Sequence, residues 1–189
     1  ENAKFINSEL PRKLTQLVIK RDKKLIHFST DCVFDGKKGN YLDDDKPDEK
    51  GIYGKSKAMG EIISKNTLVI RTSIIGRELF NHTELFEWLF SMKNRKIQGY
   101  KNVIFSGVTT LWISNIVYLI ISKYQNLSGI INVSSKPISK YELLLKLKNA
   151  FQLNIKINPN YLIKSNKVLI SKKFTEITGI NSPNWDELI

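Results

Sequence analysis

Three side chains in the first third of the chain, Thr30, Tyr53 and Lys57, could together protonate a carbonyl oxygen. A phenol has a pKa of about 10, which is too high for easy proton transfer at neutral pH, and a nearby ammonium lowers that pKa by favouring the phenolate. Tyr53 could therefore act as the general acid or base, and Lys57 could tune its pKa. Thr30 could hold the substrate oxygen through its own hydroxyl. The set suits a carbonyl that gains a hydride on carbon and a proton on oxygen.

A strand must bring the threonine to this position. Residues 24–28 are a short, mostly apolar run, which predicts a buried strand entering a sheet. Three polar residues follow where that strand should end: Ser29, Thr30 and Asp31. A loop rich in glycine, aspartate and lysine comes next.

A helix must bring the tyrosine and the lysine. Tyr53 and Lys57 open a helical pattern, and because residues four apart share a helix face, their side chains should project the same way. We assign the apolar side of this helix to three residues: Ala58, Ile62 and Ile63.

A second strand is predicted at residues 67–71, TLVIR, with Thr72 and Ser73 at its end. In open α/β sheets, ligands bind outside the carboxyl ends of the strands. Both sets of hydroxyl residues would then lie at one edge of the sheet.

These motifs resemble the extended short-chain dehydrogenase/reductase family, and within it the reductases of nucleotide-linked 4-keto-6-deoxy sugars. A lone tyrosine-x-x-x-lysine occurs often by chance, whereas YGKSK with STDxVFDG upstream is a specific combination. The resemblance is carried by Ser29-Thr30-Asp31, Val33-Phe34-Asp35-Gly36, Tyr53-Gly54-Lys55-Ser56-Lys57, Gly60-Glu61 and Arg71-Thr72-Ser73. It continues weakly to the C-terminus through residues 105–110 and 182–185.

The resemblance implies a catalytic set of Thr30, Tyr53 and Lys57, with NADH or NADPH as the cofactor and a nucleotide-diphosphate sugar as the substrate. It implies that Thr30 and Asp31 contact the substrate, and it implies no metal. The residues expected to bind the cofactor are Ser29, Tyr53, Lys57, Thr72 and Ser73. The product would enter the synthesis of surface polysaccharide precursors.

Departures from the family pattern leave the substrate open. Cys32 stands where the reductases usually carry an aromatic residue, and Ile74 and Ile75 follow where they usually carry tryptophan. Two alternatives remain: a non-catalytic sugar-nucleotide or NAD(P)-binding or regulatory subunit with the same fold, and a sugar-nucleotide epimerase. A dehydratase is disfavoured, because those enzymes usually carry Asp-Glu beside the catalytic hydroxyl.

No G-x-G-x-x-G or G-x-x-G-x-x-G motif occurs in the sequence, although a dinucleotide fold should begin with a strand, a glycine-rich turn and a helix. We therefore expect the C-terminal part of a doubly wound parallel sheet, Rossmann-like and of the α/β class, with a smaller mixed substrate lobe. Residues 1–75 would belong to the dinucleotide-binding domain and residues 76–189 to the substrate-binding lobe. The boundary is soft because the lobes interleave in this family, with one strand of the second part returning to the sheet.

The other elements follow from periodicity and caps. We predict helices at residues 3–21, where Pro11 should introduce a kink, at 83–94 and at 140–151, the last capped by Ser139. We also predict a helix after Thr109 or Thr110. Leucines and other apolar residues could line one face of the first helix: Phe5, Leu10, Leu14, Leu17 and Val18. Shorter elements are expected as strands at 103–105, 129–133 and 155–157 and a helix at 171–178.

The chain has 189 residues, a net charge of +12 and 41% hydrophobic residues. This composition is typical of a globular protein. The lysines are dispersed, which predicts a solvated basic surface and no nucleic-acid partner. No apolar run reaches the roughly 18–20 residues of a spanning helix, and the start has no signal-peptide pattern, so we expect no membrane partner and a cytoplasmic location. The oligomeric state is open, a homodimer among the alternatives.

Three further features favour ordinary structural roles. His27 should pack within its strand, and the lone Cys32 should be inert, because no adjacent base would make it a thiolate. The acidic residues of the loop favour a solvated segment over a cation site: Asp43, Asp44, Asp45, Asp48 and Glu49.

Overall fold

The computed structural model describes residues 2–189 and has the predicted α/β fold. Its main sheet is parallel and has the strand order β1-β2-β7. The strands are β1 (Leu25–Ser29), β2 (Thr67–Arg71) and β7 (Gly129–Asn132). Ser29 pairs with Arg71, and Arg71 pairs with Asn132, so the carboxyl ends of all three strands meet at one edge.

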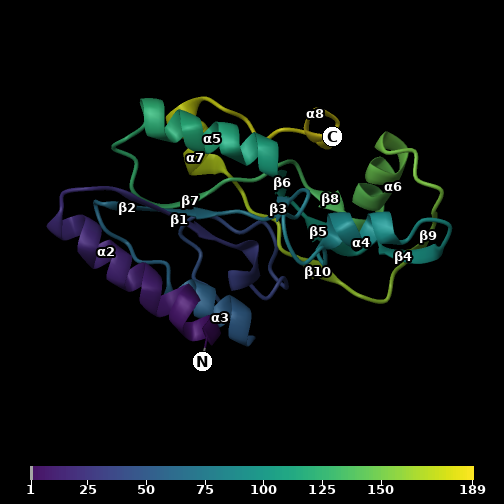
Figure 1. Ribbon diagram of the computed structural model, residues 1–189, viewed down its shortest axis with the longest axis horizontal. Coiled ribbons are helices and arrows are strands. Elements are labelled where there is room, and N and C mark those ends of the chain that lie inside the picture. Colours follow the sequence, from purple (N-terminus) through teal and green to yellow (C-terminus); the bar gives the residue numbers. More distant parts are fainter. Residues whose placement is uncertain (1) are drawn as a thin grey trace.

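Helices cover both faces of this sheet, as Figure 1 shows. One side carries α2 (Leu10–Lys20) and α3 (Ile52–Met59), and the other carries α5 (Thr110–Lys123) and α7 (Lys172–Thr178). The core on the second side joins β2, β7, α5 and α7 through Leu68, Ile70, Ile113, Ile116, Ile120, Ile131 and Phe174. β7 lies between two parts of the second lobe in sequence and returns to the sheet, as predicted.

The first helical segment differs from the prediction in its geometry and in its packing. A short α1 (Asn2–Lys4) leads into a π-helical turn, η1 (Phe5–Glu9), and α2 then runs on without a break, because Pro11 lies in its first turn, where no backbone N–H is needed. The face expected to be buried is exposed, with Leu14 at 38% and Leu17 at 46%. The helical segment packs instead through small or polar residues: Ser8, Pro11 and Thr15.

The helix that carries Tyr53 is shorter than predicted. α3 ends at Met59, with Gly60 as its C-cap, so Ile62 and Ile63 lie beyond the helix and do not form its apolar side. Ala58 packs against a small core of Val33, Phe34, Tyr41 and Leu169.

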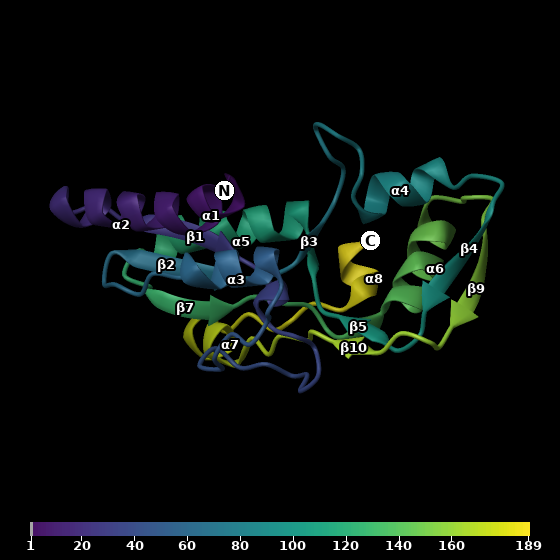
Figure 2. The same ribbon diagram turned by 90° about the horizontal axis from the view of Figure 1, so that it is seen from below.

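The second lobe lies at the far end of the molecule in Figure 2. Its helices are α4 (Leu85–Ser91), shorter at both ends than predicted, and α6 (Lys140–Ala150). Its longer strands, β4 (Lys96–Tyr100) and β9 (Lys156–Asn160), form a parallel pair. Shorter strands complete it: β5 (Val103–Phe105), β8 (Ile138–Ser139) and β10 (Ser165–Asn166) in one sheet, and β3 (Ile74–Ile75) with β6 (Val108–Thr109) in another.

Side-chain caps fix the start of several helices. Thr109 accepts a hydrogen bond from the backbone N–H of Trp112 at the start of α5, and Ser139 forms a reciprocal capping box with Glu142 at the start of α6. Asn184 and Glu187 form a second capping box on the terminal helix α8 (Trp185–Leu188). No helix within residues 2–189 combines the length and the hydropathy needed to cross a membrane.

Candidate active site

Thr30 lies where β1 gives way to a short 3-10 helix, η2 (Asp31–Val33). Its hydroxyl oxygen accepts a hydrogen bond from the Cys32 N–H at 3.1 Å, so Thr30 acts as the cap of this turn. The same hydroxyl donates to Asp31 Oδ1 at 3.1 Å. Burial raises the pKa of the Asp31 carboxyl above its usual value, and the hydrogen bond from Thr30 opposes that shift. Thr30 and Asp31 are thus fixed together at the end of the strand.

α3 brings Tyr53 close to Thr30 because Gly54 lets the helix approach the η2 turn. A Cβ at Gly54 would come within 2.1 Å of the Cys32 carbonyl oxygen, which leaves no room for a side chain. Tyr53 is 56% exposed, and its hydroxyl is close enough to Thr30 for that side chain to lower its pKa. The structure therefore brings these two predicted site residues together.

The pKa of Tyr53 shifts upward, the reverse of the direction that the sequence suggested. Burial is the main cause, and the neighbouring Cys32 and Asp31 add to it. Lys57 is not among the main causes of this shift, and its Nζ donates a hydrogen bond to the Phe28 carbonyl oxygen at 2.6 Å. Burial lowers the pKa of Lys57 itself. Tuning of Tyr53 by Lys57 stays a prediction.

Ser29 forms a hydrogen bond with one member of a buried ion pair. Its hydroxyl donates to Glu61 Oε1 at 2.6 Å, and Glu61 also accepts two hydrogen bonds from the Arg71 guanidinium, at 2.9 and 2.7 Å. The side chains of Arg71 and Glu61 are only 2% and 4% exposed. In this structure Ser29 supports the sheet edge, and its expected contact with the cofactor stays a prediction.

Arg71 also ties the acidic loop to the sheet. Its guanidinium donates to the backbone carbonyls of Asp43 and Asp45, and Asp43 Oδ1 accepts a hydrogen bond of 2.6 Å from the Asn132 N–H. The prediction of a solvated loop is therefore wrong for Asp43, which is buried against β7. No cluster of three metal-ligating side chains occurs in the part of the chain that the structure describes.

The two hydroxyl residues after β2 occupy different environments. Thr72 is buried, whereas Ser73 is half-buried and lines a cavity of about 260 Å³. This cavity extends from the end of β2 toward the second lobe, and its walls include Ile74, Glu84, Phe105 and Lys140. Ile74, one of the two isoleucines that depart from the family pattern, thus borders the candidate site.

Lys140 is the residue of this cavity that the sequence analysis missed. It is the first residue of α6, directly after the capping serine, and its Nζ lies 3.7 Å from the centroid of the Phe105 ring. The predicted cap at Ser139 marked the position of Lys140 in the helix. Its place at the cavity depends on the packing of the second lobe against the sheet, which sequence patterns do not show.

His27, Cys32 and Asn7 have structural roles near the candidate site. His27 lies in β1 with a buried Nε2 that has no hydrogen-bond partner among the described residues. Burial and the adjacent Asp31 raise the pKa of the Cys32 thiol, which agrees with an unreactive side chain. Asn7, in the π-turn, donates to the Ser56 hydroxyl at 3.1 Å and so braces the helix of Tyr53.

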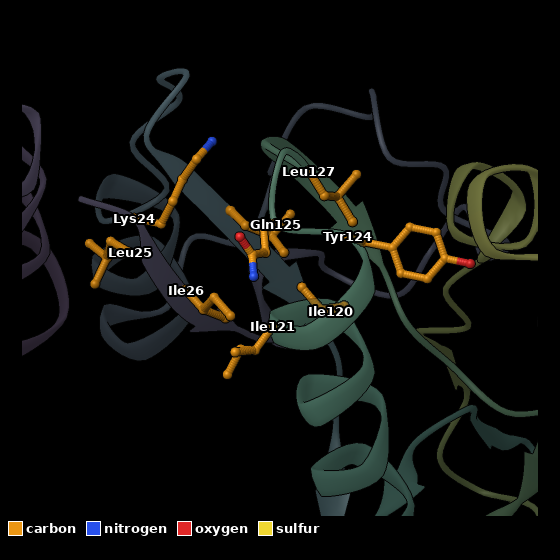
Figure 3. Close-up of a pocket in the computed structure, with 9 residues that line it drawn as sticks. Lys24, Leu25, Ile26, Ile120, Ile121, Tyr124, Gln125 and Leu127 are labelled. Carbon is orange, nitrogen blue, oxygen red and sulfur yellow. The ribbon is translucent and has the colours of Figure 1, made fainter. Parts of the chain in front are cut away.

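A second cavity of about 220 Å³ lies away from these groups, between the β1 edge and α5 (Figure 3). Its walls are mainly apolar, from Leu25 and Ile26 on the strand to Ile120 and Ile121 on the helix. It contains none of the predicted site residues.

Comparisons with known proteins identify the family. A family model described as "RmlD substrate binding domain" matches residues 1–95, half of the chain. The chain belongs to this family. A spore coat polysaccharide biosynthesis protein, SpsK of Bacillus subtilis, is 29% identical over 184 residues, which cover 87% of this chain and 62% of SpsK. A dTDP-4-dehydrorhamnose reductase of Aggregatibacter actinomycetemcomitans is 35% identical over 103 residues, covering 52% of this chain and 35% of that enzyme.

The chain therefore spans less than two thirds of the length of these curated relatives. A solved structure described as a hypothetical dTDP-4-dehydrorhamnose reductase from Sulfolobus tokodaii superposes with a TM-score of 0.81 at 27% identity, covering 96% of this chain and 68% of that one. The Bacillus anthracis reductase in complex with NADP superposes with a TM-score of 0.84 at 20% identity, covering 96% and 69%. These likenesses establish a Rossmann-like α/β fold for the RmlD-family chain.

Proposed function

We propose that this RmlD-family chain carries the proton donor and the substrate lobe of an NAD(P)-dependent reductase that acts on a nucleotide-linked 4-keto-6-deoxy sugar. The observation that carries the proposal is the approach of Tyr53 to Thr30 at the carboxyl edge of the sheet, with Lys57 one turn further along the same helix. The relatives named as a dTDP-4-dehydrorhamnose reductase and a glycan biosynthesis reductase support it, and so does the polysaccharide role named for SpsK.

The chemistry assigned to this chain is the proton transfer. The substrate carbonyl oxygen accepts one hydrogen bond from the Tyr53 hydroxyl and one from Thr30, whose single O–H turns to it from Asp31 Oδ1. Tyr53 gives its proton to that oxygen. The raised pKa of Tyr53 keeps the phenol protonated, as a donor requires. The nicotinamide, when bound, supplies the hydride to the carbonyl carbon.

The residues fit one end of such a cofactor. Tyr53 is more than half exposed and Lys57 is half-buried beside the end of β1, so a hydroxyl and an ammonium donor are available to a ribose and a nicotinamide. Ser73 lines a cavity at the end of β2. Residues 2–189 contain no G-x-G-x-x-G or G-x-x-G-x-x-G turn between a strand and a helix. The proposal therefore assigns only the ribose and nicotinamide end to this chain.

The decisive experiment measures the reduction of dTDP-4-dehydrorhamnose, with NADPH and with NADH, by the protein that contains this chain. Tyr53→Phe should lower kcat by about 10²–10⁴-fold, since this is the usual contribution of a positioned proton donor. Tyr118→Phe is the matched control, because this tyrosine is exposed on α5. Unchanged turnover by Tyr53→Phe would refute the assigned role.

A non-catalytic sugar-nucleotide-binding subunit is the second candidate. It is favoured by the hydrogen bond that directs Lys57 to the Phe28 carbonyl and by the raised pKa of Tyr53. Sugar-nucleotide binding without any NAD(P)H-dependent turnover, in the unaltered protein, would support this alternative.

A further inference from the structure

Lys140 lines the 260 Å³ cavity together with Glu84, and its ammonium forms no close ion pair with a described residue. Among residues 2–189, no carboxylate lies within ion-pair distance of its Nζ and no acceptor hydrogen-bonds to it; its close neighbour is the face of the Phe105 ring at 3.7 Å. Other lysines of this lobe do have carboxylate partners: Lys101 lies 3.4 Å from Glu142, and Lys146 contacts Asp186.

The Lys140 ammonium loses part of its hydration without gaining a close anionic partner. Burial of an ammonium is unfavourable unless it is paired, and a single aromatic face compensates only part of the lost hydration. The pKa of Lys140 is lowered by burial, and the more distant charges of Asp31, Cys32 and Glu84 only oppose that shift. An incoming anionic oxygen would provide the missing partner.

The position of the ammonium is fixed by its surroundings. The capping box between Ser139 and Glu142 defines the first turn of α6, where Lys140 is the first residue. Phe105 comes from β5, which pairs with the strand that leads into this helix. Two independent elements therefore hold the charge in one place.

The cavity adjoins the candidate catalytic hydroxyls. Asp31, which is hydrogen-bonded to Thr30, and Glu84, which lines the cavity, influence the pKa of both Tyr53 and Lys140, so the two side chains lie within electrostatic range of the same carboxylates. Ser73, at the end of β2, lines the cavity as well. A ligand whose reacting carbonyl meets Tyr53 would extend toward the ammonium.

We propose that Lys140 binds an anionic oxygen of the sugar nucleotide, supplied either by its diphosphate or by a carboxylate on its sugar. The inference deepens the proposed function and rests on it for the class of ligand. It makes Lys140 a specificity-determining residue for the anionic group of the ligand.

Calorimetric titration with UDP-glucose, UDP-glucuronic acid and dTDP-glucose tests the proposal in the absence of any cofactor. Lys140→Met removes the charge and keeps the apolar stem. Loss of a charge-assisted hydrogen bond should weaken binding by roughly 10- to 100-fold. An equal loss for UDP-glucose and UDP-glucuronic acid would identify the diphosphate, and a loss confined to UDP-glucuronic acid would identify a carboxylate.

Two controls separate binding from folding and from net charge. Lys136→Met makes the same change in charge at an exposed position four residues earlier and should bind all three probes as the unaltered protein does. Lys140→Met should unfold in urea at a midpoint no lower than the unaltered protein, since it removes a half-buried charge that has no close carboxylate partner. Equal affinity of Lys140→Met and the unaltered protein for every probe, or no binding of any probe by the unaltered protein at millimolar concentration, would overturn the proposal. Turnover by Tyr53→Phe is measured in a separate experiment, so a failure of the reductase assignment can be distinguished from a failure of the Lys140 proposal.

Discussion

His27 is held in its neutral form by its place in β1. Burial lowers its pKa to about 4, the nearby Lys57 ammonium adds to the shift, and Glu61 opposes it. An unfolded histidine has a pKa of about 6.5, so below that pH the unfolded chain takes up a proton that the folded chain resists.

We predict that this difference reduces the stability of the protein in mild acid. The contribution of His27 should be absent above about pH 6.5 and should lower the free energy of unfolding progressively as the pH falls toward 4. Its size should be on the order of 1–2 kcal/mol, after allowance for solvent screening of a partly exposed ring. Urea unfolding at several pH values, compared between the unaltered protein and His27→Gln, isolates this term. The exposed His82→Gln is the control, and equal slopes for the unaltered protein and His27→Gln would contradict the prediction.

Lys57 provides a second test at this scale, on the reaction. If its ammonium assists Tyr53 in the working complex, Lys57→Met should move the pH optimum of reduction upward and weaken cofactor binding, because the phenolate loses a stabilising charge. The pH dependence of kcat and the Kd for NADPH are the measurements. A pH profile identical to that of the unaltered protein would restrict Lys57 to the contact with Phe28.

Among the elements, α3 depends on a close backbone approach at Gly54. Gly54→Ala should force α3 away from η2, because its methyl would overlap the Cys32 carbonyl, and overpacking of this kind destabilises by about 1–3 kcal/mol. Turnover should fall as well, since Tyr53 moves with the helix. Gly51→Ala is the matched control, because there the new methyl meets only the flexible end of Glu49 at 3.3 Å. A Gly54→Ala variant as stable as Gly51→Ala would contradict this account.

The buried Glu61–Arg71 pair joins β2 to the segment after α3. Glu61→Ala leaves the guanidinium uncompensated and should lower the free energy of unfolding by about 3–5 kcal/mol. Glu176→Ala, which breaks the exposed pair with Lys172, should cost less than about 1 kcal/mol. Denaturant titration of both variants makes the comparison, and similar losses would argue against an important role for the buried pair.

The sequence predicted the elements that local chemistry determines. The caps at Thr109 and Ser139 and the strand before Thr30 were read correctly, because each depends on neighbouring residues. The exposed apolar face of α2 was not foreseen, since periodicity identifies a face without saying what covers it. The pairing of β4 with β9 joins residues about sixty positions apart, and the location of Lys140 depends on long-range packing of the same kind.

At the scale of the whole molecule, the β1 edge of the main sheet is only partly covered by other elements. β1 is an outer strand of the parallel sheet, Phe28 within it is 37% exposed, and the apolar cavity of Figure 3 opens beside it. Parallel sheets are normally buried on both faces and at most of their edges.

We predict that residues 1–189 expressed alone associate or dissolve poorly. The exposed Leu14 and Leu17 of α2 add to the apolar surface near this edge. Light scattering coupled to size-exclusion chromatography should therefore give a mass above 21.8 kDa, and Leu14→Lys with Leu17→Lys should shift it toward the monomer. Glu9→Lys, on the exposed surface of η1, is a charge control that should have no such effect. A clean monomer for the unaltered chain would disprove the expectation.

The same polypeptide should bind NADH and NADPH weakly and show no reductase activity. Affinity for a dinucleotide depends heavily on backbone N–H groups that meet the pyrophosphate, whereas Tyr53 and Lys57 can reach only the ribose and nicotinamide end. Calorimetric titration of residues 1–189 with each dinucleotide measures this. Micromolar affinity would mean that these residues build a phosphate site of another kind.

The return of β7 to the sheet has a consequence for synthesis on the ribosome. β2 obtains its second neighbour only when residues 129–132 have left the exit tunnel, and the hydrogen bond from Asn132 to Asp43 spans 89 positions. Until then the strand that ends in Arg71 keeps an open edge while the second lobe is still being made. Nascent chains arrested before residue 129 should thus be the form most dependent on chaperones, and release should follow once β7 is in place.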